Sequence, residues 1–230
     1  MGHLLTIHDV NDVRLDEYQR GAPGPKDVVV RMKACGICGS DLSYIKMGGI
    51  PMPGTKTALG HEASAEVIEV GSEVRGHSVG DRVVINGMFV GSGGMEGAFT
   101  EELLLKDAEA REKLLPIPEG VPYDIAALCE PLAVAMHGVN RAQVKAGDKV
   151  VVFGCGPIGL GMILWLVDRG VTDVVALDLA PERRERALAL GARAALDPAN
   201  CDVRAELVKL HGEVPSYGRV GVGTDAWIDA

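Results

Sequence analysis

Long hydrophobic runs are missing from this sequence. Its apolar stretches are short and broken by glycine, and they fall well under the roughly 20 residues that a membrane-spanning helix needs. Residues 1–9 contain no basic region followed by a sustained apolar one, as a secretory signal peptide would. We therefore expect neither a membrane association nor a signal peptide.

Clusters of basic residues are missing as well. The formal net charge is −9, from 23 Lys and Arg against 32 Asp and Glu. The most basic segment, residues 183–186, is interrupted by Glu185 and is typical of a solvated helix face. A protein that binds nucleic acid neutralises phosphates with clustered Lys and Arg. The composition therefore argues against a nucleic-acid partner.

Cysteine is scarce, and its arrangement excludes a disulfide framework. The five cysteines are an odd number scattered from Cys35 to Cys201, unlike the dense, even sets of small secreted domains. We therefore expect a cytoplasmic protein in a reducing environment. Glycine is abundant instead: 30 residues is about twice the usual share of roughly 7%. This indicates many tight turns or close approaches of the backbone to a ligand.

The hydrophobic pattern changes near residue 147, which predicts two domains, 1–146 and 147–230. In the first, short β-branched runs alternate with Gly and Pro and indicate a small, mostly antiparallel β domain. Its predicted strands are 27–32, 65–70 and 81–85, and helices at 124–128 and 132–142 lead to the second domain. From there strands and helices alternate, which predicts a parallel, doubly wound sheet. The predicted strands are 149–153, 173–177, 194–196 and 225–230, and the helices are 158–168, 181–190 and 203–211.

The run Gly154-Cys155-Gly156-Pro157-Ile158-Gly159 matches the pattern G-x-G-x-x-G. The pattern alone is weak in a glycine-rich chain, but here it follows a predicted strand and opens a predicted helix. Gly154 permits the tight turn, Gly156 lets a pyrophosphate approach the backbone, and Gly159 lets the helix pack on the strand. The phosphates are expected on the helix N-terminus, beside Pro157 and Ile158. The segment therefore predicts a dinucleotide site.

Asp178 closes the second predicted strand of this domain, at about the 20-residue distance expected for the acid that binds the ribose 2′-hydroxyl. A carboxylate there repels a 2′-phosphate, so it favours NAD over NADP. The alternative is a glycine-rich turn followed by an ordinary strand-end Asp.

Cys35 and Cys38 form a single C-x-x-C pair. The absence of a second pair excludes a four-cysteine zinc site, and a thioredoxin-like redox pair should open a helix in a βαβ unit, whereas this one follows a strand in a β-rich region. A catalytic zinc uses three protein ligands and leaves one position open. His61, Glu62 and Glu130 are candidate partners for a thiolate. Spacing leaves this open, since a lone His is more often structural and a Glu is usually solvated.

Four segments occur in the order seen in the medium-chain zinc-dependent alcohol dehydrogenases: residues 34–41, 60–62, 129–132 and 154–159. The chain resembles this family over essentially its whole length, closest to its sorbitol, butanediol and threonine dehydrogenase branch. The resemblance implies a GroES-like, β-rich catalytic domain followed by a Rossmann sheet. Family members continue beyond a fourth strand of that sheet, so we expect this chain to be a C-terminally truncated form with an incomplete Rossmann domain.

The resemblance also implies roles for individual residues. Cys38 and His61 match zinc ligands, Glu62 and Glu130 match positions that ligate zinc or hold its water, and Cys35 matches no ligand. The remaining matches are Asp41, which orients the ligating His, and Arg183, which covers the adenine. As a hypothesis for the reaction, we expect Ser40 to take the hydroxyl proton of the substrate and pass it outward.

Two positions depart from the family pattern. Many relatives carry a structural zinc lobe with four cysteines, but residues 86–97 contain none. We therefore expect one catalytic zinc and no structural zinc. Ser43 stands where many relatives have a proton-relay His, so the relay must be shorter or use water.

These observations predict a zinc-dependent oxidoreductase that transfers a hydride between a secondary alcohol or polyol and NAD, giving the ketone or aldehyde. The expected partner is a small-molecule alcohol, and the full-length parent is expected to be a homo-oligomer, a dimer or tetramer. Two alternatives stay open: a zinc-free quinone or enoyl reductase of the same fold, and a non-catalytic nucleotide-binding fragment.

Overall fold

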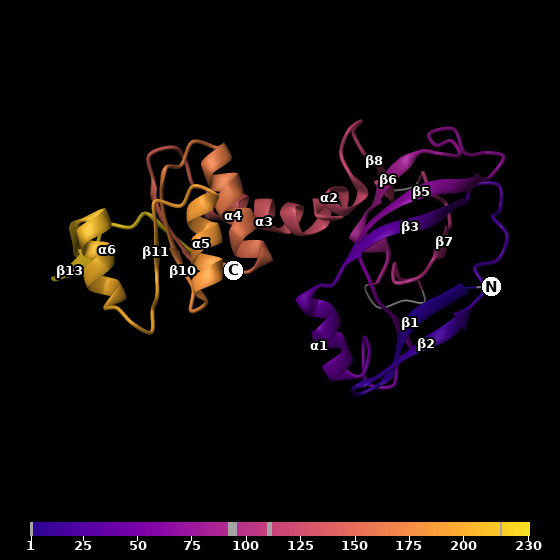
Figure 1. The fold of residues 1–230 in the computed structure, drawn as a ribbon, viewed down its shortest axis with the longest axis horizontal. Coiled ribbons are helices and arrows are strands. Elements are labelled where there is room, and N and C mark those ends of the chain that lie inside the picture. The colour runs from indigo at the N-terminus through magenta and orange to yellow at the C-terminus, as the bar shows by residue number, and fades with distance from the viewer. Residues whose placement is uncertain (1, 92–95, 110–111, 217) are drawn as a thin grey trace. The chain divides into compact units, whose positions relative to one another are not determined.

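The computed structural model describes residues 2–91, 96–109, 112–216 and 218–230. The chain forms two compact units, Met1–Glu130 and Pro131–Ala230 (Figure 1). The sequence-based boundary at residue 146 counts the linking helices with the first domain, and that assignment stays a prediction.

The first unit is built on a five-stranded antiparallel sheet with the order β7-β3-β5-β6-β8. The three strands predicted for this half are confirmed as β3, β5 and β6, and the structure extends the first two. The β-branched residues of β3 and the small residues of β5 point into one core, in which Val28, Val30, Ala63, Ala65 and Val67 are buried. The strand bounds are β3 (Val28–Gly36), β5 (Glu62–Val70), β6 (Arg82–Ile85), β7 (Glu102–Leu105) and β8 (Leu114–Pro116).

A second, three-stranded sheet was not predicted. It has the order β2-β1-β4 and also pairs antiparallel. Its strands are β1 (Gly2–Asp9), β2 (Asp12–Tyr18) and β4 (Thr57–Ala58). In β2, Val13 and Leu15 alternate with charged residues, a period of two that is typical of a strand but was not used in the sequence argument.

The helix α1 (Gly39–Met47) begins directly after Cys38. The C-x-x-C pair follows a strand as expected, since Cys35 lies at the end of β3, but the helix directly after Cys38 was not predicted. The flanking strands β3 and β5 nevertheless pair antiparallel with each other, whereas a thioredoxin-type βαβ unit needs parallel strands. A short 3-10 helix, η1 (Gly87–Phe89), follows β6.

Two predicted helices lead to the second unit, α2 (Tyr123–Ala127) and α3 (Cys129–Ala142). The first turn of α3 carries Glu130, and its later residues Ala135 and Val139 are fully buried in the core of the second unit.

The second unit is a four-stranded parallel sheet in the order β11-β10-β9-β14. This confirms the predicted Rossmann-type, doubly wound sheet. Helices cover both faces: Val150 and Val152 of the central strand pack with residues of α3, α4 and α5, while Val151 packs with Leu207 of α6. The bounds are β9 (Lys149–Phe153), α4 (Pro157–Asp168), β10 (Asp173–Leu177), α5 (Pro181–Ala189), β11 (Ala194–Leu196), α6 (Val203–His211) and β14 (Ala226–Asp229).

Proline marks the start of α4 and α5, where a missing N–H removes no helical hydrogen bond. An antiparallel hairpin of β12 (Glu213–Ser216) and β13 (Arg219–Val222) was not predicted. Over the described residues, no helix combines the length and the apolar character needed to cross a membrane.

Candidate functional site

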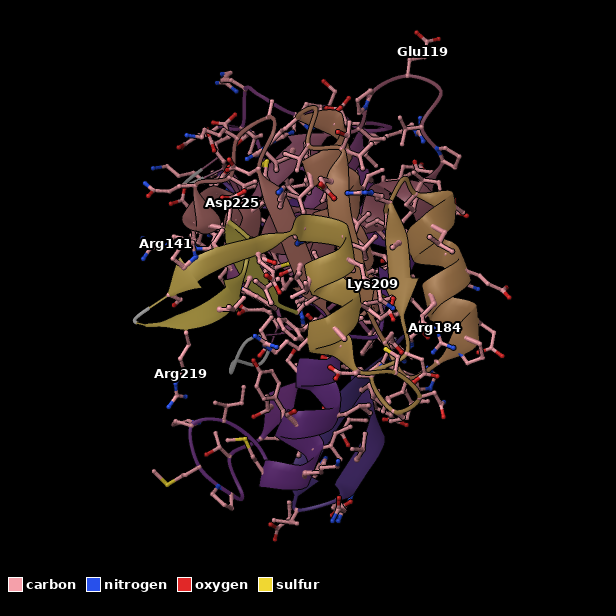
Figure 2. All side chains as sticks on the ribbon, turned by 90° about the vertical axis from the view of Figure 1, so that its left-hand side faces the viewer. Glu119, Arg141, Arg184, Lys209, Arg219 and Asp225 are labelled. Atoms are coloured by element: carbon pink, nitrogen blue, oxygen red, sulfur yellow. The ribbon has the colours of Figure 1, made fainter. Side chains whose placement is uncertain are left out.

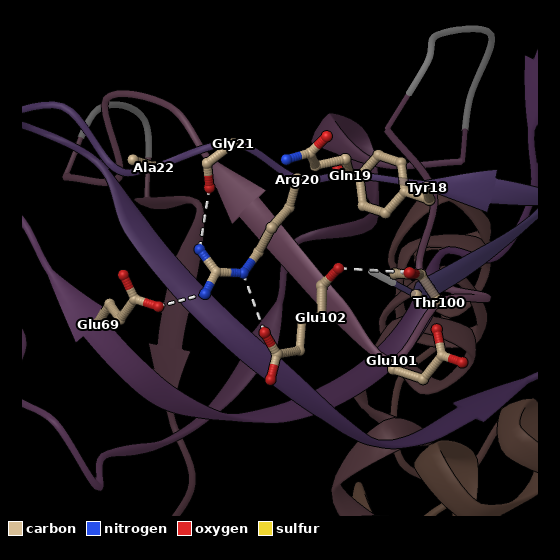
Figure 3. Close-up of a pocket in the computed structure, with 10 residues that line it drawn as sticks. Tyr18, Gln19, Arg20, Gly21, Ala22, Glu69, Thr100, Glu101 and Glu102 are labelled. Carbon is tan, nitrogen blue, oxygen red and sulfur yellow. Dashed lines mark hydrogen bonds and ion pairs between the residues drawn. The ribbon is translucent and has the colours of Figure 1, made fainter.

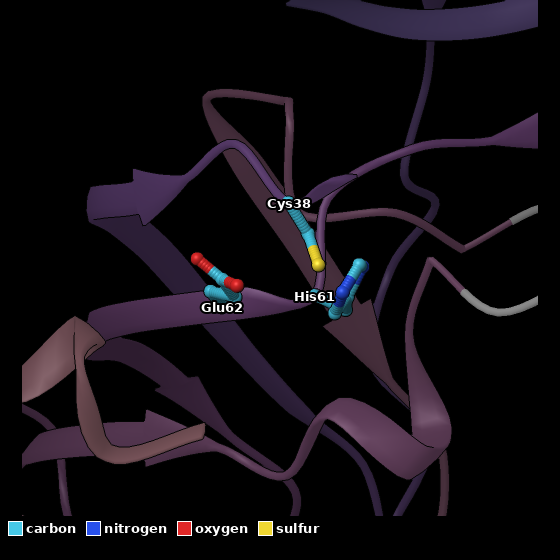
Figure 4. Close-up of side chains that lie close together, drawn as sticks. All are labelled: Cys38, His61 and Glu62. Carbon is cyan, nitrogen blue, oxygen red and sulfur yellow. The ribbon is translucent and has the colours of Figure 1, made fainter. Parts of the chain in front are cut away.

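Three potential metal donors meet in the first unit, where β3 runs into α1 beside the start of β5. They are Cys38, His61 and Glu62, and one donor atom from each lies within 4.8 Å of the others (Figure 4). His61 and Glu62 are buried, with 7% and 9% of their surface exposed, and Cys38 is partly buried. Of the candidate ligands, the structure thus gathers these three.

Strand pairing explains why the donors meet although Cys38 and His61 are 23 positions apart in the sequence. The antiparallel register places Gly36 opposite Glu62. The loop that follows Gly36 therefore passes next to the residues that open β5. The backbone N–H of Cys38 donates to Oδ2 of Asp41 at 2.9 Å, which fixes the start of α1.

The surroundings of His61 favour positive charge. Its Nδ1 lies 3.5 Å from Oδ1 of Asp41, an ion-pair distance at which neither atom makes an ordinary hydrogen bond. Its Nε2 lies 3.3 Å from Oγ of Ser40. Asp41 raises the pKa of His61 to about 9, burial opposes this shift, and Cys38 adds to it. A site that stabilises an extra proton here also stabilises a metal cation in its place.

Asp41 is almost fully buried, with 1% of its surface exposed. Burial raises its pKa, but the contacts with His61 and with the backbone N–H groups of Cys38 and Gly60 outweigh this and lower it overall. Asp41 therefore stays a carboxylate beside the imidazole, the arrangement that orients metal-binding histidines.

Cys35 and Glu130 lie differently. The Cys35 side chain packs against the core of the sheet, and burial raises the pKa of its thiol to about 12, so it stays protonated. Burial also raises the pKa of Glu130; Glu62 adds to this and His61 opposes it. Glu130 is therefore close enough to His61 and Glu62 for their charges to affect it. Within the described residues, however, it does not belong to the close group of donors formed by Cys38, His61 and Glu62.

The donor set fits zinc. A thiolate, an imidazole and a carboxylate are the ligands that zinc takes in proteins, and three protein ligands leave the fourth position of a tetrahedral site for water or substrate. The expected absence of a structural zinc concerns residues 86–97, of which 92–95 lie outside the described residues.

The glycine-rich segment of the second unit lies between β9 and α4. Gly154 has a φ of +86°, which suits glycine, and the Cα of Gly159 packs against the carbonyl of Gly154 so closely that a side chain would overlap it. Gly156 precedes α4 with no atom within 4 Å of the place of a Cβ. Pro157 and Ile158 form the first positions of the helix.

Asp178 follows β10 and is 8% exposed. Its carboxylate accepts hydrogen bonds from the N–H groups of Cys155 at 2.7 Å and Ala180 at 2.8 Å. Burial raises its pKa, but these bonds and Arg183 lower it overall. Arg183 Nη1 lies 3.7 Å from Oδ2 of Asp178.

Asp178 and Arg183 line a cavity of about 520 Å³ at the carboxyl end of the sheet. Parallel sheets bind nucleotides at this end. Sequence reasoning missed six of the residues that line it, because no motif marks them: Phe153, Leu177, Leu179, Ala180, Pro198 and Val203.

A separate hollow of about 620 Å³ lies in the first unit around Arg20 (Figure 3). Arg20 is paired there with Glu69 and Glu102 and donates to the carbonyl of Gly21. Its charge is therefore balanced within the protein, and the hollow does not contain the candidate metal donors.

Comparisons with known proteins show which family the chain resembles. Residues 24–119 match the model of the alcohol dehydrogenase GroES-like domain. The chain is 37% identical over 233 residues to (R,R)-butanediol dehydrogenase of Bacillus subtilis, covering 89% of this chain and 66% of that protein. It is 34% identical to sorbitol dehydrogenase of Bos taurus, covering 95% and 67%.

Among solved structures, the 2R,3R-butanediol dehydrogenase of Bacillus subtilis superposes with a TM-score of 0.79 at 36% identity, covering 91% of this chain and 67% of that one. The chain spans about two thirds of the length of these relatives. The resemblance inferred from the ordered motifs is confirmed: the chain belongs to the medium-chain alcohol dehydrogenase family, with the butanediol and sorbitol dehydrogenases.

Proposed function

We propose that this chain carries the catalytic zinc site and the NAD site of a dehydrogenase acting on secondary alcohols or polyols. The observation that carries the proposal is the close group of Cys38, His61 and Glu62. The relatives support the substrate class, since those from Bacillus subtilis and Bos taurus are named for butanediol and sorbitol, which both contain secondary hydroxyl groups.

Cys38, His61 and Glu62 would hold the zinc ion, and Asp41 would keep the His61 ring oriented. Zinc bound there supplies a Lewis acid that lowers the pKa of a substrate hydroxyl. Ser40 Oγ, 3.3 Å from His61 Nε2, offers a proton acceptor at the same place. The hydroxyl of Ser43 donates to the carbonyl of Gly39. Water would therefore carry the proton from Ser40 to the solvent.

The second unit would bind NAD. Bound NAD would supply the acceptor for the carbinol hydride, and the residues of this unit would hold and orient the cofactor. The N-terminus of α4, with Gly156 and Pro157, provides N–H groups and the positive end of a helix dipole for the pyrophosphate. Asp178 would bind the ribose hydroxyls and disfavour NADP, and Arg183 would cover the adenine.

Zinc content tests this proposal directly. Purified protein is expected to hold about one zinc per chain, and Cys38→Ser is expected to lose it together with NAD-dependent oxidation of secondary alcohols. Cys201→Ser, which changes a partly buried cysteine of the other unit, serves as the control and should keep the metal. Retention of zinc by Cys38→Ser would contradict the assignment.

The same measurements separate the two alternatives. A zinc-free quinone or enoyl reductase needs none of these donors and would be metal-free while reducing quinones or enoyl compounds with a nicotinamide cofactor. A non-catalytic nucleotide-binding protein would bind NAD without alcohol-dependent reduction. The gathered thiol, imidazole and carboxylate favour the dehydrogenase.

The cellular location and the oligomeric state are proposed mainly from the sequence. We propose a cytoplasmic location, since the five cysteines are free in the structure. For the full-length protein we propose a homo-oligomer, a dimer or tetramer. Light scattering on the purified full-length protein measures the oligomeric state, and a monomer of that protein would contradict the proposal.

A further inference from the structure

Arg184 lies near the start of α5 (Figure 2), and its side chain makes hydrogen bonds with the turn that follows β10. Its Nη1 atom donates to the carbonyl oxygens of Asp178 and Leu179, at 2.8 Å each. The same atom lies 3.2 Å from Oδ2 of Asp197, and the two side chains of this ion pair are only 19% and 21% exposed. Arg184 therefore makes its contacts within the protein.

The partners of Arg184 belong to two segments that line the 520 Å³ cavity. Asp178 and Leu179 lie in the turn after β10, and Pro198 follows Asp197 directly after β11. Asp197 accepts two further hydrogen bonds from residues that follow it, which fix its carboxylate. Arg184 thus joins the two segments of the cavity wall.

The position of the Asp178 carboxylate depends on the same turn. Of its two backbone donors, one is the N–H of Cys155 in the glycine-rich loop and the other is the N–H of Ala180 in the turn itself. A displacement of the turn would therefore move the carboxylate away from the glycine-rich loop. Arg184 holds the two carbonyl groups that precede Ala180.

We propose that Arg184 is a positioning residue: by fixing the turn after β10, it sets how strongly Asp178 discriminates between an adenosine with a free 2′-hydroxyl and one with a 2′-phosphate. This inference rests on the proposed nucleotide site. It extends that site by a residue that does not line the cavity.

Charge alone predicts the opposite effect. Removing a cation near the cavity weakens a ligand with an additional phosphate more than one without it, because the additional phosphate has the stronger attraction to that cation. Loss of Arg184 as a simple charge would therefore increase the preference for the 2′-hydroxyl. Loss of Arg184 as a positioning residue decreases that preference, and general destabilisation leaves it unchanged.

The test uses the full chain and two probes, adenosine 5′-monophosphate and adenosine 2′,5′-bisphosphate, titrated by calorimetry. The quantity of interest is the ratio of the Kd for the bisphosphate to the Kd for the monophosphate. Arg184→Met is expected to lower this ratio about tenfold, the size expected when hydrogen bonds from a charged donor are lost. Arg184→Lys should restore part of it.

Arg186→Met is the matched control. It removes the same charge from an exposed position of the same helix and should not lower the ratio. Zinc content, which depends on the other unit, should stay unchanged in both variants. If Arg184→Met does not fold, Asp197→Asn weakens the ion pair with Arg184 and is expected to lower the ratio by a smaller factor.

The outcomes separate this inference from the proposed function. Binding of the monophosphate with an unchanged or higher ratio in Arg184→Met overturns the role of Arg184 and leaves the nucleotide site standing. An equal fall in Arg186→Met also overturns it. A wild-type chain that binds neither probe overturns the nucleotide site and the role of Arg184 together.

Discussion

Gly36 lies directly opposite Glu62 in the antiparallel pairing of β3 and β5, and a Cβ on Gly36 would overlap the Glu62 carboxylate. The glycine of the C-x-x-C segment thus provides the space that the carboxylate occupies beside Cys38 and His61. A larger residue at this position would force the carboxylate to another place.

Gly36→Ala is therefore expected to weaken zinc binding, by about 10- to 100-fold as for other changes that displace a metal ligand. Gly39→Ala is the control, since nothing lies within 4 Å of a Cβ at this first position of α1. The zinc affinity of both variants is measured by the retention of zinc in competition with a chelator. Equal retention in the two variants would show that the Glu62 position does not matter for the metal.

Glu62→Gln and Glu130→Gln should differ in their effect on zinc. Glu62 belongs to the close group of donors and Glu130 does not, so only the first change removes a ligand charge from the group. We expect Glu62→Gln to lose zinc and Glu130→Gln to keep it, by metal analysis after gel filtration. The reverse result would make Glu130 the third ligand.

Asp41→Asn should lower zinc affinity by about 10- to 100-fold, because the partner that orients His61 loses its charge. The same change leaves the Cys38 N–H with a weaker, neutral acceptor. Asp12→Asn, a partly exposed position paired with Arg14, should leave the affinity unchanged. Circular dichroism verifies that the sheets have formed in both. An unaffected Asp41→Asn would remove Asp41 from the metal site.

Buried His211 should make the second unit sensitive to acid. Burial lowers the pKa of His211 from its ordinary 6.5, the charges of Lys149 and Arg193 add to this, and Asp173 opposes it. The folded state therefore keeps His211 neutral, while the unfolded state gains a proton below pH 6.5. The contribution of neutral His211 to the free energy of unfolding is therefore complete above pH 6.5. It is lost as the pH falls toward the pKa that His211 has in the folded state.

Urea unfolding followed by tryptophan fluorescence measures this effect, because both tryptophans of the chain, Trp165 and Trp227, lie in the second unit. The urea concentration at the midpoint of unfolding is expected to decrease when the pH is lowered from about 7 to about 5 in the wild type. It is expected to decrease less in His211→Gln. His137→Gln is the control in the same unit and should retain the pH dependence. Identical pH profiles of wild type and His211→Gln would contradict the prediction.

The local sequence determined much of the second unit. Strands and helices from Lys149 to His211 follow the predicted ranges closely, because apolar runs of strand length alternate there with proline-initiated helices. The ordered motifs also identified the family without any structure. Each of these signals lies within a short stretch of chain, so reading it needs no knowledge of distant contacts.

Only the tertiary structure decided which candidate residues meet. The pairing of β3 with β5 brings Cys38 to His61 and Glu62, and it turns Cys35 into the core. The role of Gly36, and the connection that Arg184 makes between the ends of β10 and β11, are likewise absent from any motif. Strand register and side-chain direction depend on contacts between segments far apart in the chain, and no local pattern records these contacts.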